Sequence, residues 1–396
     1  LGTLAGLYES AIDMLCSSSG VRPKVVASTA TIRNAASQIR GLFDRKFCQF
    51  PPPLIDARDS FFAKEDTNSP SRKYVGIFNP GVSGPTSFIR STSCILHSPY
   101  ADNVNDKYKN PYWTFLGYFN SLRELGGARI QIIDDVNAYL KTCAQRDGTQ
   151  FPREIVDVCE LTSRRDGADL TKAREDLSIN YGDDECLDAV IATNMISVGL
   201  DVPRLGVMSI VGQPKTTAEY IQASSRVGRK FPGLVVTLYN PMRSRDRSHY
   251  ERFVHYHSRL YAEVEATSVT PWSIRARERA LHASFISCVR HLCPSMQCNG
   301  DAGSFTDSAK VKEIVRWFVD RAKGADTREG KLTEEMFKEI ISQWERMNGS
   351  KRAYSTGHKN LHDALLVPFE EPGDFQGFRT MQSMRNVDAA ANLYLK

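Results

Sequence analysis

The residues best suited to chemistry lie together past the middle of the chain, where a glutamine and two arginines form the pattern Q-x-x-x-R-x-x-R: Gln222, Arg226 and Arg229. They stand at the end of a segment that predicts a helix. Arginine stays charged and offers a planar fork of N–H donors, which suits a phosphate group. The three side chains therefore predict a site that binds a phosphate group. The alternative is a basic helix end that interacts only with its own carbonyl groups.

A second polar segment follows residues 187–193, an apolar run that predicts a β-strand. It contains Thr193, Gly199 and Asp201. The threonine offers a hydroxyl to a nucleic-acid phosphate, and the glycine allows close approach of the backbone. The carboxylate can accept a hydrogen bond from a ribose hydroxyl or bind the arginine segment. A plain turn before a proline explains the glycine and the aspartate, but not their register with Thr193.

Two shorter segments with hydroxyl groups also follow predicted strands. Thr162 and Ser163 come after residues 155–161, and they predict either a phosphate-contact loop or a solvated turn. The other cluster comes after residues 24–27 and consists of Ser28, Thr29, Ala30 and Thr31. Taken alone, this cluster favours a simple helix cap provided by its last threonine.

In this order, the segments at 28–31, 193–201 and 222–229 resemble motifs III, V and VI of superfamily 2 helicases. These are ATP-driven motors whose two RecA-like lobes close over a nucleotide and move along a nucleic-acid strand. More narrowly, residues 199–271 resemble the helicase subunit of DISARM anti-phage systems. The runs that carry this likeness are G-Q-P-K-T-T-A-E-Y at 212–220, L-Y-N-P at 238–241, D-R-S-H-Y at 246–250 and T-S-V-T-P at 267–271.

The resemblance implies that Arg226 and Arg229 are catalytic arginine fingers. In the family, such arginines reach the nucleotide held by the other lobe and stabilise charge as the bond to its γ-phosphate breaks. Gln222 matches the glutamine that helps to align that site. Ser225 stands where the family has a glycine, so the sequence departs from the family pattern at this position and leaves the local approach of the backbone open.

The resemblance also implies roles for the remaining segments. The cluster at 28–31 matches the segment that couples the ATP site to the strand-binding cleft. Gly199 and Asp201 match nucleotide-side positions, and Thr193 matches a contact to the strand. The cofactors implied are ATP and Mg²⁺, and the partner implied is DNA, single-stranded or duplex with a single-stranded end. A companion subunit of the defence system is implied in the same way.

The phosphate cradle of such a motor does not occur in this sequence. No G-x-x-x-x-G-K-S/T run is found, and the nearest string, Gly330-Lys331-Leu332, lacks the hydroxyl. The acidic run at 183–185 precedes a predicted strand instead of ending one, which favours a solvated loop. We expect the chain to start just after the Mg²⁺-binding acidic box of the family. The fragment alone is therefore predicted to be inactive, whereas the full protein hydrolyses ATP.

A basic stretch follows the arginine segment. Arg243, Arg245 and Arg247 lead a series of arginines interleaved with tyrosines and a phenylalanine, up to residue 261. Guanidinium groups meet phosphates and aromatic rings stack on bases, so this composition predicts binding of a single strand. An equal alternative is a helix whose rings pack inward and whose arginines are solvated.

Short apolar runs alternate with helical patterns through the middle of the chain. The runs predict strands at 74–78, 113–119, 155–161, 187–193, 207–211 and 234–239. This alternation predicts an α/β fold, a RecA-like parallel sheet with flanking helices. We assign residues 1–70 to the remnant of a first lobe with a linker, 71–242 to the second lobe, and 243–396 to a helical accessory region. In the remnant, the sequence predicts strands at 24–27 and 47–50 and a helix at 33–43. In the accessory region, it predicts helices at 276–292, 310–322 and 333–347.

Composition sets the broad class. A net charge of +5 is too small to draw nucleic acid to the whole surface, so any attraction must come from local clusters. No apolar run reaches the roughly 18 residues of a membrane span, and a cytoplasmic protein without a membrane partner is expected. Nine scattered cysteines indicate reduced thiols. Cys288, Cys293 and Cys298 with His291 lack the C-x-x-C spacing of a zinc knuckle, and no metal site is predicted.

Two other functions stay open at this point. One is a repair-type superfamily 2 helicase with a C-terminal zinc cluster, which a missing four-cysteine set disfavours. The other is a nucleic-acid-binding scaffold that keeps a motor fold without turnover. The retention of the glutamine and both arginines favours the motor, because a scaffold does not need an arginine fork that faces a γ-phosphate.

Overall fold

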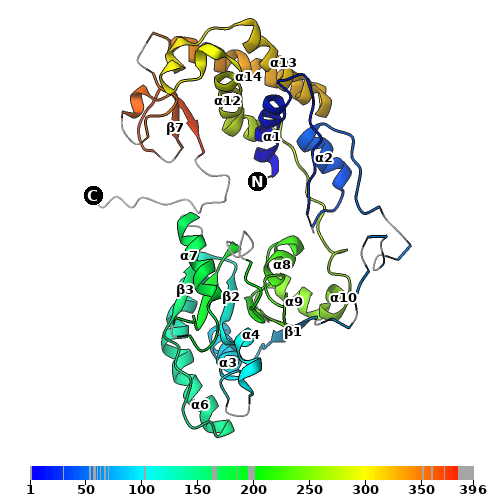
Figure 1. Ribbon diagram of the computed structural model, residues 1–396, viewed down its shortest axis with the longest axis vertical. Helices are drawn as coiled ribbons and strands as arrows, with labels where there is room; N and C mark the ends of the chain where they lie inside the picture. Colours follow the sequence, from blue (N-terminus) through cyan, green and yellow to red (C-terminus); the bar gives the residue numbers. More distant parts are fainter. Residues whose placement is uncertain are drawn as a thin grey trace. The chain divides into compact units, whose positions relative to one another are not determined.

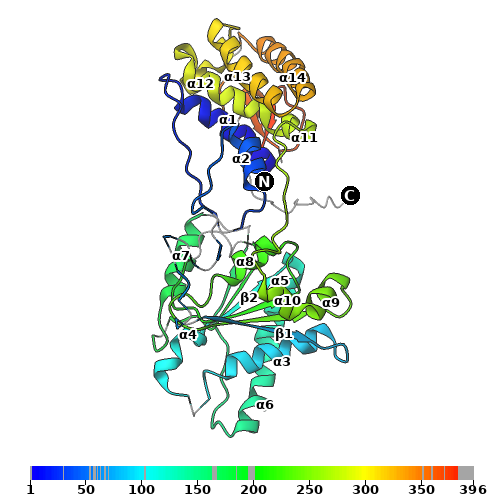
Figure 2. The same ribbon diagram turned by 90° about the vertical axis from the view of Figure 1, so that its right-hand side faces the viewer.

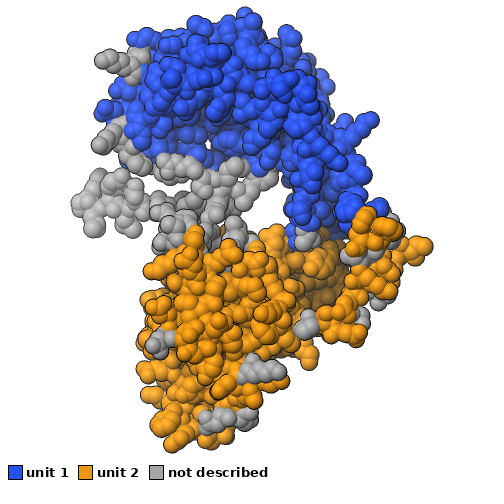
Figure 3. Space-filling view, in the orientation of Figure 1, with its two compact units in different colours: residues 1–53, 266–396 blue, residues 54–265 orange. Residues whose placement is uncertain are grey.

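The chain forms two compact units, which are coloured separately in Figure 3. One unit contains residues 1–53 and 266–396, and the other contains residues 54–265. The predicted division at residues 70 and 242 stays a prediction. The computed structural model describes residues 2–29, 31–52, 55–56, 59, 61–62, 64–66, 68–69, 71–101, 104–162, 167–183, 185–194, 201–349, 352–357, 360–369 and 371–381.

The unit of residues 54–265 is built on a six-stranded sheet in which every pairing is parallel. The strand order is β1-β6-β5-β2-β4-β3. The strands are β1 (Arg72–Phe78), β2 (Phe115–Phe119), β3 (Val158–Leu161), β4 (Ala189–Ala192), β5 (Val207–Val211) and β6 (Gly233–Tyr239). Strands β2 and β4 are buried along their whole length, as expected where both faces of a parallel sheet are covered. The predicted parallel sheet is confirmed.

Helices cover both faces of the sheet. Phe88 and Leu140 belong to the core on one face, which α3 (Gly84–His97), α5 (Leu122–Gln131) and α6 (Asn137–Asp147) cover. Leu177, Tyr220 and Tyr256 belong to the core on the other face, which α7 (Gly167–Ser178), α8 (Thr217–Ser224) and α10 (Phe253–Ser258) cover. Figure 2 shows α3 and α6 on the side of the sheet away from α8 and α10. The shorter helices α4 (Asn110–Trp113) and α9 (Ser244–Glu251) lie outside these two layers.

The connections leave neighbouring strands in opposite directions. Strand β5 continues to α8 on one face, whereas its neighbour β2 continues to α5 on the other face. Strands β1 and β6 are also neighbours, and they continue to α3 on one face and to α10 on the other. Loops that diverge in this way open a crevice at the carboxyl ends of the strands, where ligands of open α/β sheets bind.

The unit of residues 1–53 and 266–396 is mainly helical. Its larger helices are α1 (Gly2–Cys16), α2 (Ala35–Phe43), α12 (His282–Leu292), α13 (Ala309–Ala325) and α14 (Thr327–Arg346), and Figure 1 shows α1, α12, α13 and α14 gathered together. Short helices, among them α11 (Ile274–Ala276), connect them. Leu7 on α1, Phe285 on α12 and Trp344 on α14 share one core. The C-terminal part of the chain is helical as predicted, while the bounds 243–396 given to that region stay a prediction. The structure adds a small parallel pair, β7 (Leu366–Pro368) and β8 (Phe378–Thr380).

Two predicted strands near the N-terminus are wrong. Residues 24–27 and 47–50 are irregular and lie on the surface; Val26 is 85% exposed and Phe50 is 70% exposed. A strand needs a neighbouring strand to satisfy its N–H and C=O groups, and in the described part of the chain none pairs with these residues. Their assignment to a first-lobe remnant stays a prediction. The helix predicted at 33–43 is present as α2.

None of the helices in the described ranges combines the length and the apolar composition that a membrane span needs.

A buried arginine fixes the amino ends of β2, β3 and β4. Arg153 donates to the carbonyl oxygens of Leu96 at 2.9 Å and Trp113 at 3.0 Å, and it pairs with Asp188 at 2.9 Å. Its guanidinium also lies 3.8 Å from the centre of the Trp113 ring. Asp188 in turn accepts the backbone N–H of Val156 at 3.0 Å. The pair is almost fully buried, so each charge depends on the other.

Replacement of Asp188 by alanine should therefore destabilise this unit. The change leaves the guanidinium of Arg153 buried without a counter-charge, which costs about 3–5 kcal/mol of unfolding free energy. Urea unfolding of the chain measures the loss. The control is Asp106→Ala, which removes a surface pair with Lys109 and should cost less than about 0.5 kcal/mol. Equal losses in the two variants would contradict this account of the buried pair.

Candidate nucleotide and nucleic-acid interface

The helix that carries the Q-x-x-x-R-x-x-R pattern is held firmly at its start. Thr216 caps α8, because its side chain accepts the backbone N–H of Glu219 at 3.2 Å. The N–H of Thr217 donates to both carboxylate oxygens of Glu265, at 2.8 and 3.0 Å. The apolar face of α8, including Tyr220, packs on the sheet, whereas Gln222 is exposed. The helix therefore presents the glutamine to solvent.

The turn after α8 is pressed against the start of two strands. Gly228 has φ = 72°, and a Cβ atom there would lie 2.7 Å from the Cα of Gly233 in β6. Its N–H donates to the carbonyl oxygen of Leu205 at 2.9 Å. The side chain of Arg72, which begins β1, donates to the carbonyl oxygen of Val227 at 2.7 Å. Only glycine therefore fits at position 228, just before the second arginine of the pattern, without strain.

An ion pair joins the two sequence segments around residues 201 and 229. The guanidinium of Arg229 contacts the carboxylate of Asp201, and it also donates to the carbonyl oxygen of Ser225 at 3.3 Å. Both partners remain accessible, with side chains 34% and 52% exposed. Burial and the neighbouring Arg229 lower the pKa of Arg226, and Asp201 partly opposes that change. The structure therefore brings Asp201, Arg226 and Arg229 together.

The predicted hydroxyl groups meet at a different edge of the sheet. Thr162 and Thr193 follow the carboxyl ends of β3 and β4, which are neighbours in register. The N–H of Thr193 donates to the carbonyl oxygen of Leu161 at 3.3 Å, so the two strand ends are joined directly. Both threonines are buried, at 3% and 7% exposure. The predicted site residues Ser163, Gly199 and Ala30 lie outside the described residues.

The third predicted hydroxyl cluster belongs to the other unit. Ser28 and Thr29 are exposed in an irregular segment, and the N–H of Thr31 donates to the hydroxyl of Thr29 at 3.2 Å. These residues do not follow a strand, because the strand predicted at 24–27 is not formed. Their coupling role stays a prediction.

The basic stretch divides into exposed arginines and packed rings. Arg245 and Arg247 are exposed on α9, while Arg243, which precedes α9, forms an ion pair with Glu124 of α5. Tyr250 stacks on Phe78, with ring centres 4.7 Å apart. Tyr256 is buried, whereas Tyr261 is 62% exposed. The packing of Tyr250 and Tyr256 and the exposure of Arg245 and Arg247 match the alternative in which rings pack inward, whereas the exposed ring of Tyr261 does not.

Sequence reasoning missed a buried carboxylate that connects this stretch to the sheet. Asp246 has no exposed surface. It accepts the backbone N–H of Gln213 at 3.2 Å and of Asn240 at 2.8 Å, and so it ties together the loops that leave β5 and β6. The only signal in the sequence was a single acidic residue among arginines.

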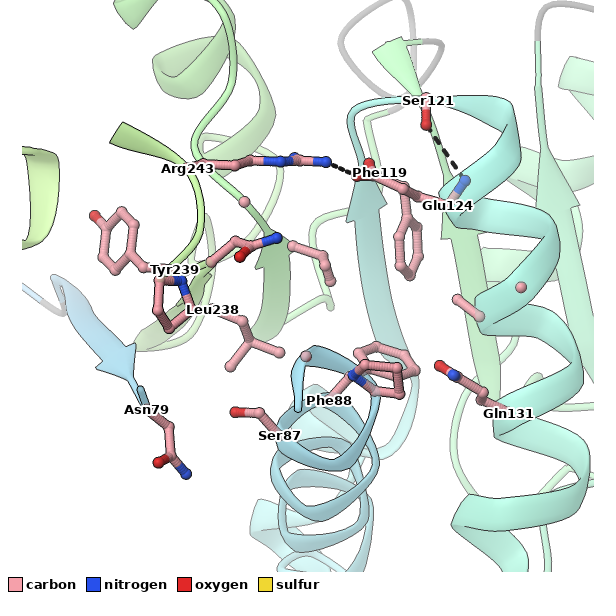
Figure 4. A pocket seen from close by; sticks show the side chains of 18 of the residues that line it. Asn79, Ser87, Phe88, Phe119, Ser121, Glu124, Gln131, Leu238, Tyr239 and Arg243 are labelled. Carbon is pink, nitrogen blue, oxygen red and sulfur yellow. Dashed lines mark hydrogen bonds and ion pairs between the residues drawn. The ribbon is translucent and has the colours of Figure 1, made fainter. Parts of the chain in front are cut away.

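A cavity of about 590 Å³ was also missed. It lies at the carboxyl ends of β1, β6, β5 and β2, between the first turns of α3 and the length of α5 (Figure 4). Its walls come from residues far apart in the sequence, among them Asn79, Phe119 and Leu238. Arg243 and Glu124 close one side of it with their ion pair.

Metal-ligand geometry does not occur in the part of the chain that the structure describes: no group of three or more His, Cys, Asp or Glu side chains could hold an ion. Cys288 and Cys293 are buried, and burial raises the pKa of both thiols. Cys298 is exposed.

A parallel sheet with helices on both faces is the α/β architecture of RecA-like lobes, and the arginine-bearing turn lies beside the start of two of its strands. Residues 139–231 match the family described as helicase conserved C-terminal domain. Along its whole length, it is 40% identical over 418 aligned residues to the DISARM protein DrmA of Bacillus paralicheniformis (strain ATCC 9945a / NCIMB 11709 / CD-2). The chain spans 37% of the length of that relative. The predicted resemblance to the helicase subunit of DISARM systems is confirmed.

Solved helicase structures also resemble the chain, at lower similarity. The DUF1998 helicase MrfA bound to DNA and AMPPNP is 14% identical, with a TM-score of 0.48, over 80% of this chain and 38% of that protein. The Mycobacterium smegmatis helicase Lhr bound to ssDNA and AMP-PNP is 14% identical, with a TM-score of 0.41, over 67% of this chain and 31% of that protein.

Gly228→Ala should lower the stability of the chain, because a left-handed conformation costs a residue with a Cβ about 1–2 kcal/mol and the contact with Gly233 adds to that. Thermal or urea unfolding measures the change. The control is Gly126→Ala in the middle of α5, where a Cβ meets no neighbour. That change should stabilise the chain by about 0.5–1 kcal/mol. A neutral Gly228→Ala variant would show that the turn relaxes easily.

Proposed function

We propose that this chain supplies the second RecA-like lobe of an ATP-dependent superfamily 2 DNA helicase or translocase that acts in anti-phage defence. The observation that supports this most is the ion pair between Arg229 and Asp201. It joins two segments 28 residues apart that separately resemble helicase motifs, with Arg226 beside them. The likeness to a DISARM protein supports the defence role.

The two arginines act on the nucleotide in this proposal. ATP supplies the phosphoryl group, and hydrolysis builds negative charge on the oxygens around the γ-phosphate. Arg226 and Arg229 donate N–H groups toward that charge, with Gln222 beside them on the exposed face of α8. Asp201 is a positioning residue that holds Arg229 before the nucleotide arrives. A group of exposed and half-buried guanidinium groups fits a phosphate, so the donors suit the ligand.

The remaining predicted residues act on the strand. Thr162 and Thr193, with Ser163, contact phosphates at the carboxyl edge, where two strand ends lie side by side. Arg245 and Arg247 extend this contact, and Arg243 extends it once its side chain leaves Glu124. Gly199 lies on the nucleotide side, and Ser28 to Thr31 couple the two ligands. DNA is the polymer in this proposal, and ATP acts together with Mg²⁺.

Arg229→Ala in the full-length protein should lower the turnover number for ATP by about 10³-fold, since a missing finger leaves transition-state charge unpaired. DNA affinity should stay within a few-fold. Steady-state ATPase assays and fluorescence anisotropy measure the two effects. Lys230→Ala is the matched control, because it removes an adjacent exposed positive charge that is not part of the pattern. If Arg229→Ala kept a rate within a few-fold, the finger assignment would be wrong.

The isolated 396-residue chain should show no DNA-stimulated ATP hydrolysis, because its sequence holds no phosphate loop. A coupled assay with and without single-stranded DNA measures this. The full-length protein, assayed in parallel, is the positive control. ATP hydrolysis by the isolated chain would contradict the proposal that it supplies only the second lobe of the ATPase site. No turnover by either would favour the non-catalytic scaffold.

A further inference from the structure

The cavity at the carboxyl edge lies where the fold itself opens a crevice. Strands β5 and β2 send their connections to opposite faces, and so do β6 and β1. All four strand ends line the cavity. Ligands of open α/β sheets bind at such switch points, because no loop covers the space between the diverging connections. The volume of about 590 Å³ lies in the usual range for ligand pockets.

Its inner walls suit a flat apolar body. Phe88 of α3 and Phe119 of β2 meet edge to face, with ring centres 5.8 Å apart. Both rings lie at the inner end of the space, with Leu238 of β6 across from them (Figure 4). Both phenylalanines are buried, at 4% and 1% exposure. The inner walls of the cavity are therefore apolar, with the two phenylalanine rings packed against each other in the core behind them.

Its rim carries amide groups. Asn79 and Gln131 line the cavity from opposite sides (Figure 4), and neither side-chain amide has a hydrogen-bond partner among the described residues. Asn240 also lines it and keeps its amide N–H groups available, because its side-chain oxygen alone accepts a bond, from the N–H of Met242 at 2.9 Å. An amide offers a donor and an acceptor side by side, which matches the edges of nucleobases.

The charge at the mouth is net positive. The guanidinium of Arg243 and the carboxylate of Glu124 neutralise each other. Arg123, also at the lining and exposed, has no ion pair within the described part of the chain. A ligand with an apolar ring, polar ring edges and an attached anionic group fits all three features. A nucleotide has these properties, whereas an apolar peptide side chain leaves the amides and Arg123 unused.

We propose that this cavity binds one nucleobase of a single strand, with the attached phosphate beside Arg123. The idea rests on the proposed function, since a strand must lie along this edge of the sheet. It goes beyond that function by assigning a base pocket to residues that contact neither the proposed nucleotide site nor the threonines at β3 and β4. The same base chemistry could come from a free nucleotide, which the experiment separates.

Two adjacent glycines provide a matched test. Gly126 and Gly127 are both exposed on α5, and a Cβ atom at either position meets no neighbour. Only Gly127 lines the cavity. Gly127→Phe should fill the space, whereas Gly126→Phe adds the same side chain outside it. The two variants gain the same helix propensity, so their difference reports on the cavity alone.

The measurement is the affinity of the chain for two short DNA strands of equal length and charge, one intact and one built of abasic nucleotides. Fluorescence anisotropy gives both dissociation constants. Competition by deoxyadenosine monophosphate tests whether a free nucleotide binds in the same cavity. The unchanged protein should bind the intact strand about tenfold more tightly, because a base held in the cavity adds affinity that an abasic nucleotide lacks. Gly127→Phe should abolish this preference without weakening the abasic strand, and Gly126→Phe should retain it.

Three outcomes decide the proposal. If Gly127→Phe still binds the intact strand more tightly than the abasic strand, the base pocket is overturned. An equal loss of affinity for both strands also overturns it, because that result indicates a general effect on the path of the strand. If the unchanged protein binds neither strand, the proposed function fails on its own. In that case, binding of the mononucleotide that Gly127→Phe abolishes still supports a base site, and absence of binding overturns it.

Discussion

Parallel strand pairing is the constraint on which the rest of the sheet unit depends. Because all six strands point the same way, every strand ends at one edge and begins at the other. The loops with Thr162, Thr193, Gly212 and Asn240 therefore lie along the same edge of the sheet, although they come from distant parts of the sequence. The crossover helices must return to the opposite edge, so α8 carries the arginine turn to the beginning of β1 and β6.

The same constraint explains how much of the fold the sequence predicted. Strands buried on both faces are continuous apolar runs, and the run at 207–211 coincides with β5. The run at 24–27 has the same character, but it forms no strand. An apolar run indicates that a segment suits a sheet. It does not indicate that a neighbouring strand is present to form hydrogen bonds with it. The residues around Val26 and Phe50 remain irregular for that reason.

Candidate site residues could be recognised in the sequence where they stand close together in the chain. The cavity was missed because its walls come from distant parts of the chain. Fixed spacing revealed Gln222, Arg226 and Arg229, and the contact with Asp201 agrees with the expected pairing of the two segments. The cavity between α3 and α5 has no local pattern, since four separate strand ends build it. Aromatic residues among arginines were ambiguous, because composition cannot distinguish a ring such as Tyr250 packed on Phe78 from a ring that faces solvent.

Exposure separates the arginines that hold the fold from those that are free to act. Arg153 and Asp188 are 1% and 12% exposed, and breaking such a pair costs about 3–5 kcal/mol. Arg229 and Asp201 are 34% and 52% exposed, and pairs that face solvent contribute only about 0.2–1 kcal/mol. Separating Arg229 from Asp201 therefore costs much less free energy than separating Arg153 from Asp188. The pair of Arg243 and Glu124, with side chains 42% and 28% exposed, resembles the accessible pair. If a phosphate binds at Arg229 as proposed, it competes with a weak ion pair and not with one on which the fold depends.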